Sequence, residues 1–186
     1  MRLEPIALPE VVDITPPRHG DDRGFFSETW NRRAFQDGGI SIDFVQDNQS
    51  LSSAAGTLRG LHFETPPHAQ AKLVRVLQGA IFDVAVDIRA GSPTFGQWVG
   101  LELSRAKWNQ LFIPVGFAHG FVTLVPETEV AYKVSDYYAP KHDRAIRFDD
   151  PAIGIDWPPG LPPFQLSEKD RTAPRLADID TGFVYS

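Results

Sequence analysis

A regular alternation of side chains over residues 81–88 constrains the fold of this chain more than any other feature of its sequence. A period of two is the period of a β-strand, because successive side chains of a strand point to opposite faces of its sheet. One face is apolar and the other is mixed: Phe82, Val84, Val86 and Ile88 form the first, and Ile81, Asp83, Ala85 and Asp87 the second. We therefore predict a strand whose more polar face lines a cavity.

Glycine and proline residues punctuate the whole chain and separate short runs of β-forming residues. The 15 Gly and 16 Pro residues are spread along its length, a pattern that favours an all-β sandwich or barrel over a helical or doubly wound fold. No repeat, linker or low-complexity segment interrupts the sequence, so residues 1–186 are predicted to form one domain. Other strands are expected within 1–13, 25–30, 42–49, 96–103, 110–125 and 129–138.

Two short helices are expected among these strands. Residues 31–39 form the better candidate, ended by Gly38 and Gly39. A second helix is expected to begin at the SEKDR segment, 167–171, with Ser167 as its N-cap. Loops and turns are expected over 16–24, 51–56 and 153–164.

Composition and charge exclude several classes of function. A formal net charge of -6 argues against sequence-independent binding to nucleic acid, which depends on a basic surface. No apolar run is long enough to span a membrane, and the first residues lack the basic-then-apolar form of a signal peptide, so we predict a cytoplasmic protein. The absence of cysteine excludes disulfides, thiolate chemistry and cysteine ligands to a metal.

The segment from Thr57 to Asp87 holds several residues with useful chemistry. A cation, Arg59, is followed by a potential base, His62, and Lys72 begins the next predicted strand after a Pro-Pro turn. Because Arg59 and His62 are three residues apart, a regular strand would point them to opposite faces. Both can reach one cavity only if the strand bends or bulges, and Gly60 is the residue expected to permit this.

The segment IPVGFAHGF, 113–121, has the P-x-G-x-x-H form of the second signature of the cupin family of small β-barrels. A tight turn at Pro114 and Gly116 would deliver His119 to the mouth of the barrel. Metal-binding cupins also need an earlier H-x-H pair and a downstream Glu, whereas the corresponding region here offers only His62 and His68. A metal needs several converging ligands, so no metal site is predicted.

Taken together, the segments of this chain resemble one cupin branch, the dTDP-4-dehydrorhamnose 3,5-epimerase family, in order and over nearly the whole length. The resemblance implies a cupin-like jelly-roll barrel, a homodimer, a dTDP-4-keto-6-deoxy sugar as substrate, and no metal or organic cofactor. The matching segments are GDDRGFFSETW (20–30), FVQDNQS (44–50), LRGLHFE (58–64), QAKLVRVLQGAIFDVAVDIR (70–89), SPTFGQWVG (92–100), IPVGFAHGFVTL (113–124), YKVSDYY (132–138), AIGIDWP (152–158) and LSEKD (166–170).

The same resemblance implies proton abstraction at the carbons next to a ketone, and return of a proton on the opposite face. Such chemistry needs a base, an acid across the substrate and a cation at the ketone oxygen. By matching position, His62 is the base, Asp170 the carboxylate that orients it, Lys72 the cation and Tyr132 the acid. A carboxylate on one ring nitrogen fixes the tautomer of a histidine and stabilises its imidazolium.

The resemblance also implies a set of substrate-binding residues. Arg23 and Arg59 match positions at the diphosphate, where the Arg fork pairs well with phosphate oxygens. His119 would line the sugar pocket, and Tyr138 would stack on the thymine in the partner subunit's site. Further matching positions are Phe26, Glu28, Gln46, Asp47, Asn48, Asp143 and Lys169. Two residues depart from the family pattern, because Asp143 stands where Glu is usual and Ala71 where Gly is usual.

Taken singly, each candidate also has a purely structural interpretation. His62 and His119 could be satisfied structural histidines, and Tyr132 shares its strand face with core residues. Asp170 could be a first-turn helix charge, and Arg23 an exposed turn residue paired with a neighbouring Asp. The complementary set favours function over these interpretations.

The sequence is compatible with several related functions. Relatives that epimerise only C3 or only C5 of such sugars are expected to keep the same His, Lys and Tyr residues. A ketone isomerase, a sugar-nucleotide binding barrel without catalysis, and a metal-dependent cupin also remain open at this level.

Overall fold

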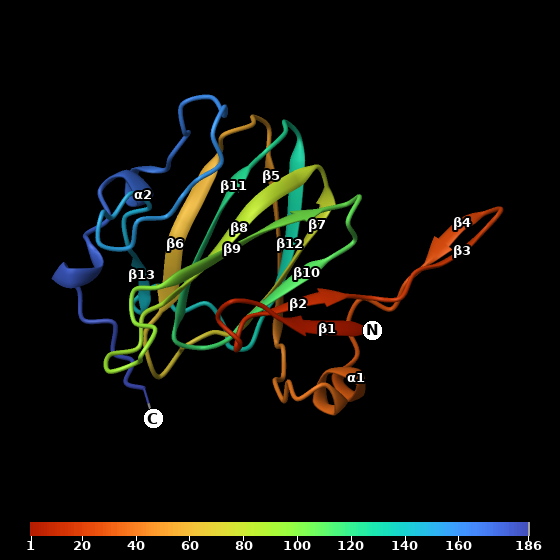
Figure 1. Cartoon of the computed structure of the whole chain (residues 1–186), viewed down its shortest axis with the longest axis horizontal. Coiled ribbons are helices and arrows are strands. Elements are labelled where there is room, and N and C mark those ends of the chain that lie inside the picture. Colours follow the sequence, from red (N-terminus) through yellow and green to blue (C-terminus); the bar gives the residue numbers. More distant parts are fainter. Residues whose placement is uncertain (186) are drawn as a thin grey trace.

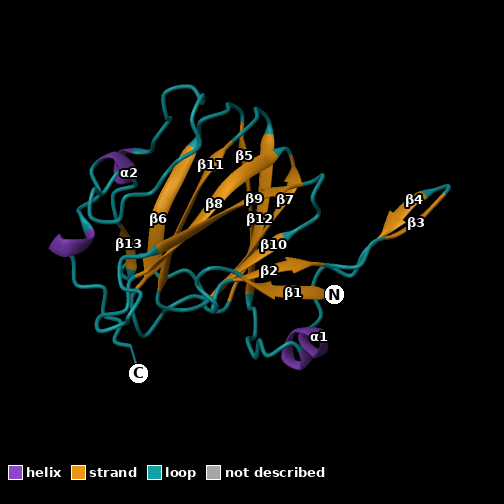
Figure 2. Ribbon diagram, viewed as in Figure 1, coloured by secondary structure: helices purple, strands orange, loops and turns teal. Residues whose placement is uncertain are grey.

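Two antiparallel β-sheets packed face to face form the body of the protein, and a two-stranded hairpin projects from it (Figure 1; Figure 2). This computed structural model describes residues 1–185. The elements are β1 (Arg2–Pro5), β2 (Val12–Thr15), β3 (His19–Asp21), β4 (Gly24–Phe26), α1 (Arg32–Asp37), β5 (Gln46–Ser52), β6 (Leu58–Glu64), β7 (Lys72–Gln78), β8 (Ala80–Asp87), β9 (Trp98–Ser104), β10 (Gln110–Ile113), β11 (Phe117–Thr123), β12 (Thr128–Val134), β13 (Asp143–Ala145), α2 (Glu168–Arg171) and a 3₁₀ turn, η1 (Leu176–Asp178).

Strands that are distant in sequence lie side by side in both sheets. The six-stranded sheet has the order β1-β2-β10-β7-β12-β5, and the five-stranded sheet the order β13-β6-β11-β8-β9. Consecutive strands such as β7 and β8 therefore belong to different sheets, as in jelly-roll folds. The prediction of an all-β jelly roll with a few short helices is confirmed. No helix within residues 1–185 is long and apolar enough to cross a membrane.

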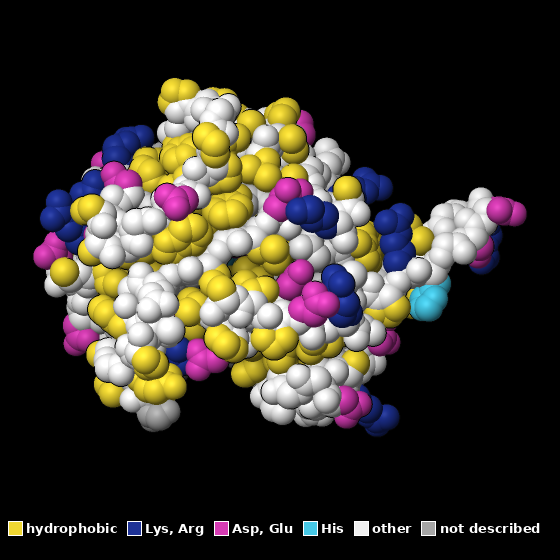
Figure 3. All heavy atoms as spheres, in the orientation of Figure 1, with side chains coloured by type: hydrophobic (Ala, Val, Ile, Leu, Met, Phe, Trp, Pro, Cys, Tyr) yellow, Lys and Arg dark blue, Asp and Glu magenta, His cyan; other side chains and the backbone are white. Residues whose placement is uncertain are grey.

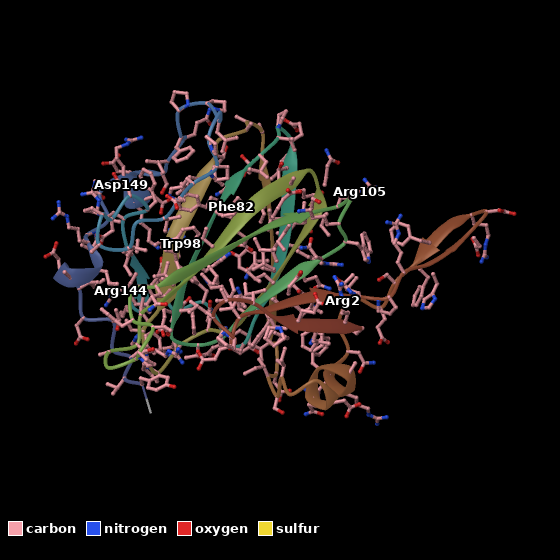
Figure 4. All side chains as sticks on the ribbon, viewed as in Figure 1. Arg2, Phe82, Trp98, Arg105, Arg144 and Asp149 are labelled. Carbon is pink, nitrogen blue, oxygen red and sulfur yellow. The ribbon has the colours of Figure 1, made fainter. Side chains whose placement is uncertain are left out.

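Both faces of β8 are buried, which explains the alternation in its sequence. Ile81 and Ala85 point between the sheets, and Val84 and Val86 pack under the C-terminal segment that covers the five-stranded sheet. Apolar side chains therefore fill both the space between the sheets and the space under the C-terminal segment. Phe82 and Trp98, labelled in Figure 4, pack in the second of these spaces. The strand prediction is confirmed.

The acidic residues of β8 do not line the cavity described below, so that part of the sequence interpretation is wrong. Asp83 and Asp87 are both fully buried. Asp83 accepts a hydrogen bond from His119, and Asp87 accepts bonds from Arg89 and two hydroxyl groups. These carboxylates support other side chains instead of facing a ligand.

The helices begin and end where the sequence predicts. The side chain of Asn31 caps α1 by accepting from two backbone N–H groups, and Gly38 follows its last turn. Ser167 caps α2 by accepting from the backbone N–H of Asp170. Several strand expectations need correction, because predicted runs such as 110–125 and 129–138 also differ from the observed β10, β11 and β12. β5 begins at Gln46 instead of residue 42, β4 ends at Phe26 instead of residue 30, and the predicted loop 16–24 contains the hairpin β3–β4.

β6 contains a bulge at Gly60, as the spacing of Arg59 and His62 predicted. The pairing of β6 with β11 shifts register between His119 and Phe121, opposite this glycine. Gly60 has φ +126°, and a Cβ atom there would lie 2.5 Å from the Cα atom of Gly120. Only glycine fits, because an L side chain is disfavoured at this φ and would meet backbone. The Gly60–Leu61 peptide bond is cis.

We expect Gly60→Ala to lower the free energy of unfolding by roughly 2–4 kcal/mol, because the new methyl group meets backbone that cannot move aside. Gly24→Ala is the matched control, since Gly24 has φ +131° but nothing within 4 Å of an added Cβ atom. It should lose only about 1 kcal/mol. Urea denaturation of both variants measures the difference, and equal losses would contradict the steric explanation.

Candidate active site

A cavity of about 480 Å³ opens between the two sheets and receives side chains from both. A second cavity of about 380 Å³ adjoins it and shares His62, Lys72 and Tyr132 with the first. The structure thus brings the four predicted catalytic residues to one place, because Asp170 also lines the larger cavity. Its lining is Ser50, Thr57, Leu58, Arg59, His62, Lys72, His119, Phe121, Tyr132, Gln165, Leu166, Ser167 and Asp170.

His62 forms a close pair with Asp170, from the other end of the sequence. The distance between His62 Nε2 and Asp170 Oδ1 is 2.5 Å. Burial opposes the charge of Asp170, but the hydrogen bond and charge of His62 and the hydroxyl of Ser167 outweigh it and lower the pKa of this carboxyl. With Nε2–H donating to the carboxylate, Nδ1 of His62 keeps a lone pair that can accept a proton.

Cross-strand pairing places His119 beside His62. The two residues are direct partners between β11 and β6, so their side chains share one face of the five-stranded sheet. His119 donates through Nε2 to Asp83 Oδ1 at 2.5 Å. Burial lowers the pKa of His119, although Asp83 acts in the opposite direction. His119 is therefore held as a neutral ring whose Nδ1 can accept a hydrogen bond.

Lys72 enters the cavity from the opposing sheet, at the first position of β7. Its Nζ atom donates to the backbone carbonyl of His62 at 3.5 Å, and 9% of the residue is exposed. Burial lowers the pKa of Lys72 to about 8, against the attraction of Asp83, Asp143 and Glu64. A buried ammonium of this kind is suited to stabilise negative charge on a ligand oxygen.

Tyr132 faces the cavity from β12, on the sheet opposite His62. Its strand parity places it with Val130 and Val134, and its ring packs against the core between the sheets. Tyr132 can therefore be both a core residue and a catalytic one, because the interior face of the sheet that carries it also borders the cavity. Burial raises the pKa of Tyr132 above its ordinary value, so the phenol keeps its proton near neutral pH.

The rim of the adjoining cavity carries polar and charged side chains. Gln46 and Asn48 lie on one face of β5 and hydrogen-bond each other at 2.8 Å. Asp143 lies 2.5 Å from Lys169 Nζ and accepts a bond of 3.4 Å from the Tyr138 hydroxyl. The predicted residues Asp143, Lys169 and Tyr138 therefore meet at one place, and Tyr138 lines the cavity of its own chain.

Arg59 lines the larger cavity with His62, as the bulge at Gly60 requires. It donates weakly to the side chain of Ser52 and the backbone carbonyl of Leu51, both at 3.4 Å. No carboxylate within residues 1–185 forms an ion pair with this guanidinium, so its charge is free for an anionic ligand.

Four of the predicted binding residues lie away from these cavities. Asp47 points to the outer face of β5, opposite to its neighbours Gln46 and Asn48, and pairs with Lys133 at 2.8 Å. Arg23 and Phe26 lie on the projecting hairpin, and Glu28 follows it. Figure 3 shows that this hairpin stands clear of the body. Arg23 pairs with Asp21 and its side chain is 90% exposed.

Several site residues escaped sequence reasoning. Ser50, Thr57, Gln165 and Ser167 line the cavity, and strand parity with Gln46 and Asn48 could have identified Ser50. Glu64 lines the adjoining cavity, and burial raises the pKa of its carboxyl. Within residues 1–185 no group of three or more His, Asp or Glu side chains converges as a metal ion would require.

Comparison with known proteins places this geometry in a family. A family model described as dTDP-4-dehydrorhamnose 3,5-epimerase matches residues 5–178. The dTDP-4-dehydrorhamnose 3,5-epimerase of Pseudomonas aeruginosa is 52% identical over 181 residues, which are 97% of this chain and 98% of that protein. That of Sinorhizobium fredii is 49% identical over 185 residues, covering 100% and 94%.

A solved structure extends the likeness to three dimensions. The crystal structure of a dTDP-6-deoxy-D-glucose-3,5-epimerase from Legionella pneumophila, in complex with dTDP-4-keto-L-rhamnose, matches with a TM-score of 0.95. The two chains are 46% identical, and the match covers 100% of this chain and 98% of the other.

Replacement of the buried ammonium should stabilise the fold. Because the pKa of Lys72 is about 8 in the folded protein and 10.5 as an ordinary lysine, the folded state binds this proton less tightly than the unfolded state does. We expect Lys72→Met to raise the free energy of unfolding at pH 7 by about 1–3 kcal/mol. The gain should fade as the pH rises from 8 towards 10.5, where the wild-type lysine loses its charge in both states.

Urea denaturation between pH 7 and 10 tests this expectation. Lys107→Met, at a side chain that is 51% exposed, is the control and should change stability by less than about 0.5 kcal/mol. A Lys72→Met variant less stable than wild type at pH 7 would show that the ammonium is not under strain from burial.

Proposed function

Because the chain belongs to the dTDP-4-dehydrorhamnose 3,5-epimerase family, we propose that its cavity converts dTDP-4-dehydro-6-deoxy-D-glucose to dTDP-4-dehydro-L-rhamnose. This reaction inverts C3 and C5 of the sugar and is a step in the supply of dTDP-L-rhamnose. The observation that carries the proposal is the placement of His62 and Tyr132 on opposite sheets across one cavity, with Lys72 beside them. Nucleotide sugars are made from cytoplasmic nucleotides, so the proposal includes a cytoplasmic location.

The ketone at C4 makes the hydrogens at C3 and C5 acidic, and His62 removes them as base. Nδ1 of His62 takes the proton, and Asp170 stabilises the imidazolium that forms. The electron pair of the broken C–H bond moves onto the ketone oxygen, where the ammonium of Lys72 stabilises the enolate. No step needs a redox partner, because the substrate and product are isomers.

Tyr132 completes each inversion by giving its proton to the carbon from the opposite face. One such round leaves the imidazole protonated and the phenol deprotonated, so both must exchange protons with solvent before the second carbon reacts. The cavity is open enough for this exchange, since the side chain of His62 is 31% exposed. The raised pKa of Tyr132 favours rapid recovery of its proton.

The nucleotide is proposed to lie along the adjoining cavity. Arg59 and Lys169 supply positive charge for the diphosphate, which a chain with a net charge of -6 must provide locally. Gln46 and Asn48 offer amide groups. The sequence resemblance implies that Tyr138 stacks in the partner's site, but its ring, which is 57% exposed, lines the cavity of its own chain, and we assign its stacking surface to the thymine bound there. The rim of one chain therefore supplies part of a nucleotide site.

A second copy of the chain is proposed to supply the rest. Arg23 and Phe26 lie on a hairpin that projects from the body, and they line neither cavity of their own chain (Figure 1). An isolated two-stranded hairpin is marginally stable in water, and Phe26 is 70% exposed. A homodimer in which each hairpin reaches the partner's nucleotide site accounts for the exposed ring and for the distance of Arg23 from its own cavity.

Solvent deuterium tests the proposed chemistry. In heavy water the purified protein should incorporate deuterium at both C3 and C5 of the 4-keto-6-deoxy sugar nucleotide, as read by NMR of the product. His62→Asn should reduce incorporation by at least about a thousandfold, since the base is lost, while binding of dTDP changes by less than about threefold. Tyr132→Phe, which removes only the hydroxyl group, should allow proton removal but prevent inversion.

Each competing function predicts a different pattern in the same spectra. Deuterium at one carbon only would identify an epimerase specific for C3 or C5. No incorporation by a folded protein that binds dTDP would identify a binding barrel without catalysis. Turnover by His62→Asn at the wild-type rate would remove the proposed base.

Heterodimers test the proposed role of the hairpin in the partner's site. Arg23→Ala and His62→Asn chains carrying different affinity tags are co-expressed, and the mixed dimers are isolated. If Arg23 acts in the partner's site, one site of each mixed dimer carries both substitutions and the other carries none. We expect about half of the wild-type turnover, although each parent homodimer is strongly impaired.

The opposite arrangement gives the opposite result. If Arg23 served its own chain, both sites of the mixed dimer would carry one substitution and no activity would return. Asp22→Ala in place of Arg23→Ala is the control for a change at the hairpin tip. Sedimentation of the wild-type protein as a monomer under assay conditions would also exclude the proposed dimer.

A further inference from the structure

We propose that Asp83 is a positioning residue of this reaction, one that fixes the ring of His119 and holds positive charge on Lys72. The inference deepens the proposed function and rests on it. Asp83 lines neither cavity, although the alternation in its strand predicted a cavity-lining face, and the family resemblance assigned it no role. Its side chain is fully buried in the middle of β8, on the sheet face that also carries His119.

Strand register explains how Asp83 reaches His119. On the shared face of β11 and β8, His119 is the direct partner of Ala85, and Asp83 lies two residues along the same strand. Because side chains alternate with a period of two, Asp83 and His119 are diagonal neighbours on one face. The small side chain of Ala85 leaves this diagonal open, and the bond from His119 Nε2 to Asp83 Oδ1 is 2.5 Å long.

The second oxygen of Asp83 points to a role beyond this bond. Oδ2 is buried and makes no hydrogen bond with any residue from 1 to 185. A buried carboxylate with one oxygen unpartnered is unfavourable unless positive charge lies nearby. The groups that act on Lys72 are Asp83, Asp143 and Glu64, which favour its charged form, and Lys169, which opposes it; among the carboxylates, Asp83 has the largest influence.

The bond to His119 and the charge interaction with Lys72 give Asp83 two effects on the reaction. Its negative charge offsets the cost of burying the ammonium of Lys72, so that the cation is present at neutral pH when the enolate forms. Its hydrogen bond fixes the tautomer of His119, whose Nδ1 then faces other partners as an acceptor. The groups that act on His119 are Asp83, Lys72 and His62, and Asp83 alone among these is an anion.

Two substitutions separate the effects. Asp83→Asn removes the charge but keeps an oxygen that can accept from His119. The alkaline limb of the kcat profile should therefore move to lower pH, with kcat at pH 8.5 reduced about tenfold or more and KM changed less than twofold. Asp83→Ala also removes the acceptor, so KM should rise as well. Asp83→Ser is a second charge-free variant in case the Asn variant does not fold.

The titration of Lys72 gives a readout that does not depend on turnover. NMR of the protein labelled with ¹³C at the lysine ε-carbon, with the Lys72 signal assigned from Lys72→Met, should show its midpoint moving to lower pH in Asp83→Asn. A wild-type protein without epimerase activity would refute the proposed function and leave this shift intact. Normal turnover together with an unmoved Lys72 midpoint would overturn the role of Asp83 alone.

Asp87→Asn is the matched control, because Asp87 is equally buried on the same strand but bonds to Arg89, Ser92 and Thr94 at its far end. Arg89 keeps Glu10 as a second partner. This variant should lower the melting temperature yet leave both the Lys72 midpoint and the pH profile of kcat unchanged. If Asp87→Asn and Asp83→Asn shift the pH profile equally, the effect is a general one of buried charge, and the proposal is overturned.

Discussion

The close contact of β6 with β11 is the constraint on which the site depends. At Gly60 and Gly120 the two backbones approach so closely that a Cβ atom on either glycine would lie within 3.0 Å of its neighbours. The bulge that this contact permits changes the phase of β6, so that Arg59 and His62 line one cavity. A regular strand would have turned one of them into the core or outward. Arg59 and His62, the proposed phosphate-binding cation and base, thus share a cavity because two glycines meet.

Sequence patterns predicted the presence of helices and strands better than the residues at which they begin and end. The period of two in β8 and the capping residues Asn31 and Ser167 are local signals, and local structure follows them. The hairpin β3–β4 was missed because its short strands lie in a polar, glycine-containing segment that is typical of a loop. A local sequence pattern does not show whether such a segment folds into a β-hairpin.

The site could be predicted as far as its residues carry distinctive chemistry. Family resemblance assigned His62, Lys72 and Tyr132 the roles of base, cation and acid, and the structure brings these three residues together. The supporting role of Asp83 was not identifiable, because its partner His119 lies 36 residues away on a neighbouring strand. The position of Asp47 outside the cavity follows from strand parity with Gln46, a signal that was present in the sequence.

The two-sheet architecture divides the chemistry in a way that suits inversion at carbon. An epimerisation needs proton removal and proton return on opposite faces of one carbon, and a single sheet face cannot supply both. Here the five-stranded sheet carries His62, whereas the six-stranded sheet carries Lys72 and Tyr132. The packed core fixes the separation of the sheets, so the base and the acid are held apart by the same apolar contacts that stabilise the fold. Burial of the Lys72 ammonium lowers the stability of the fold, but it places a cation where an enolate would need one.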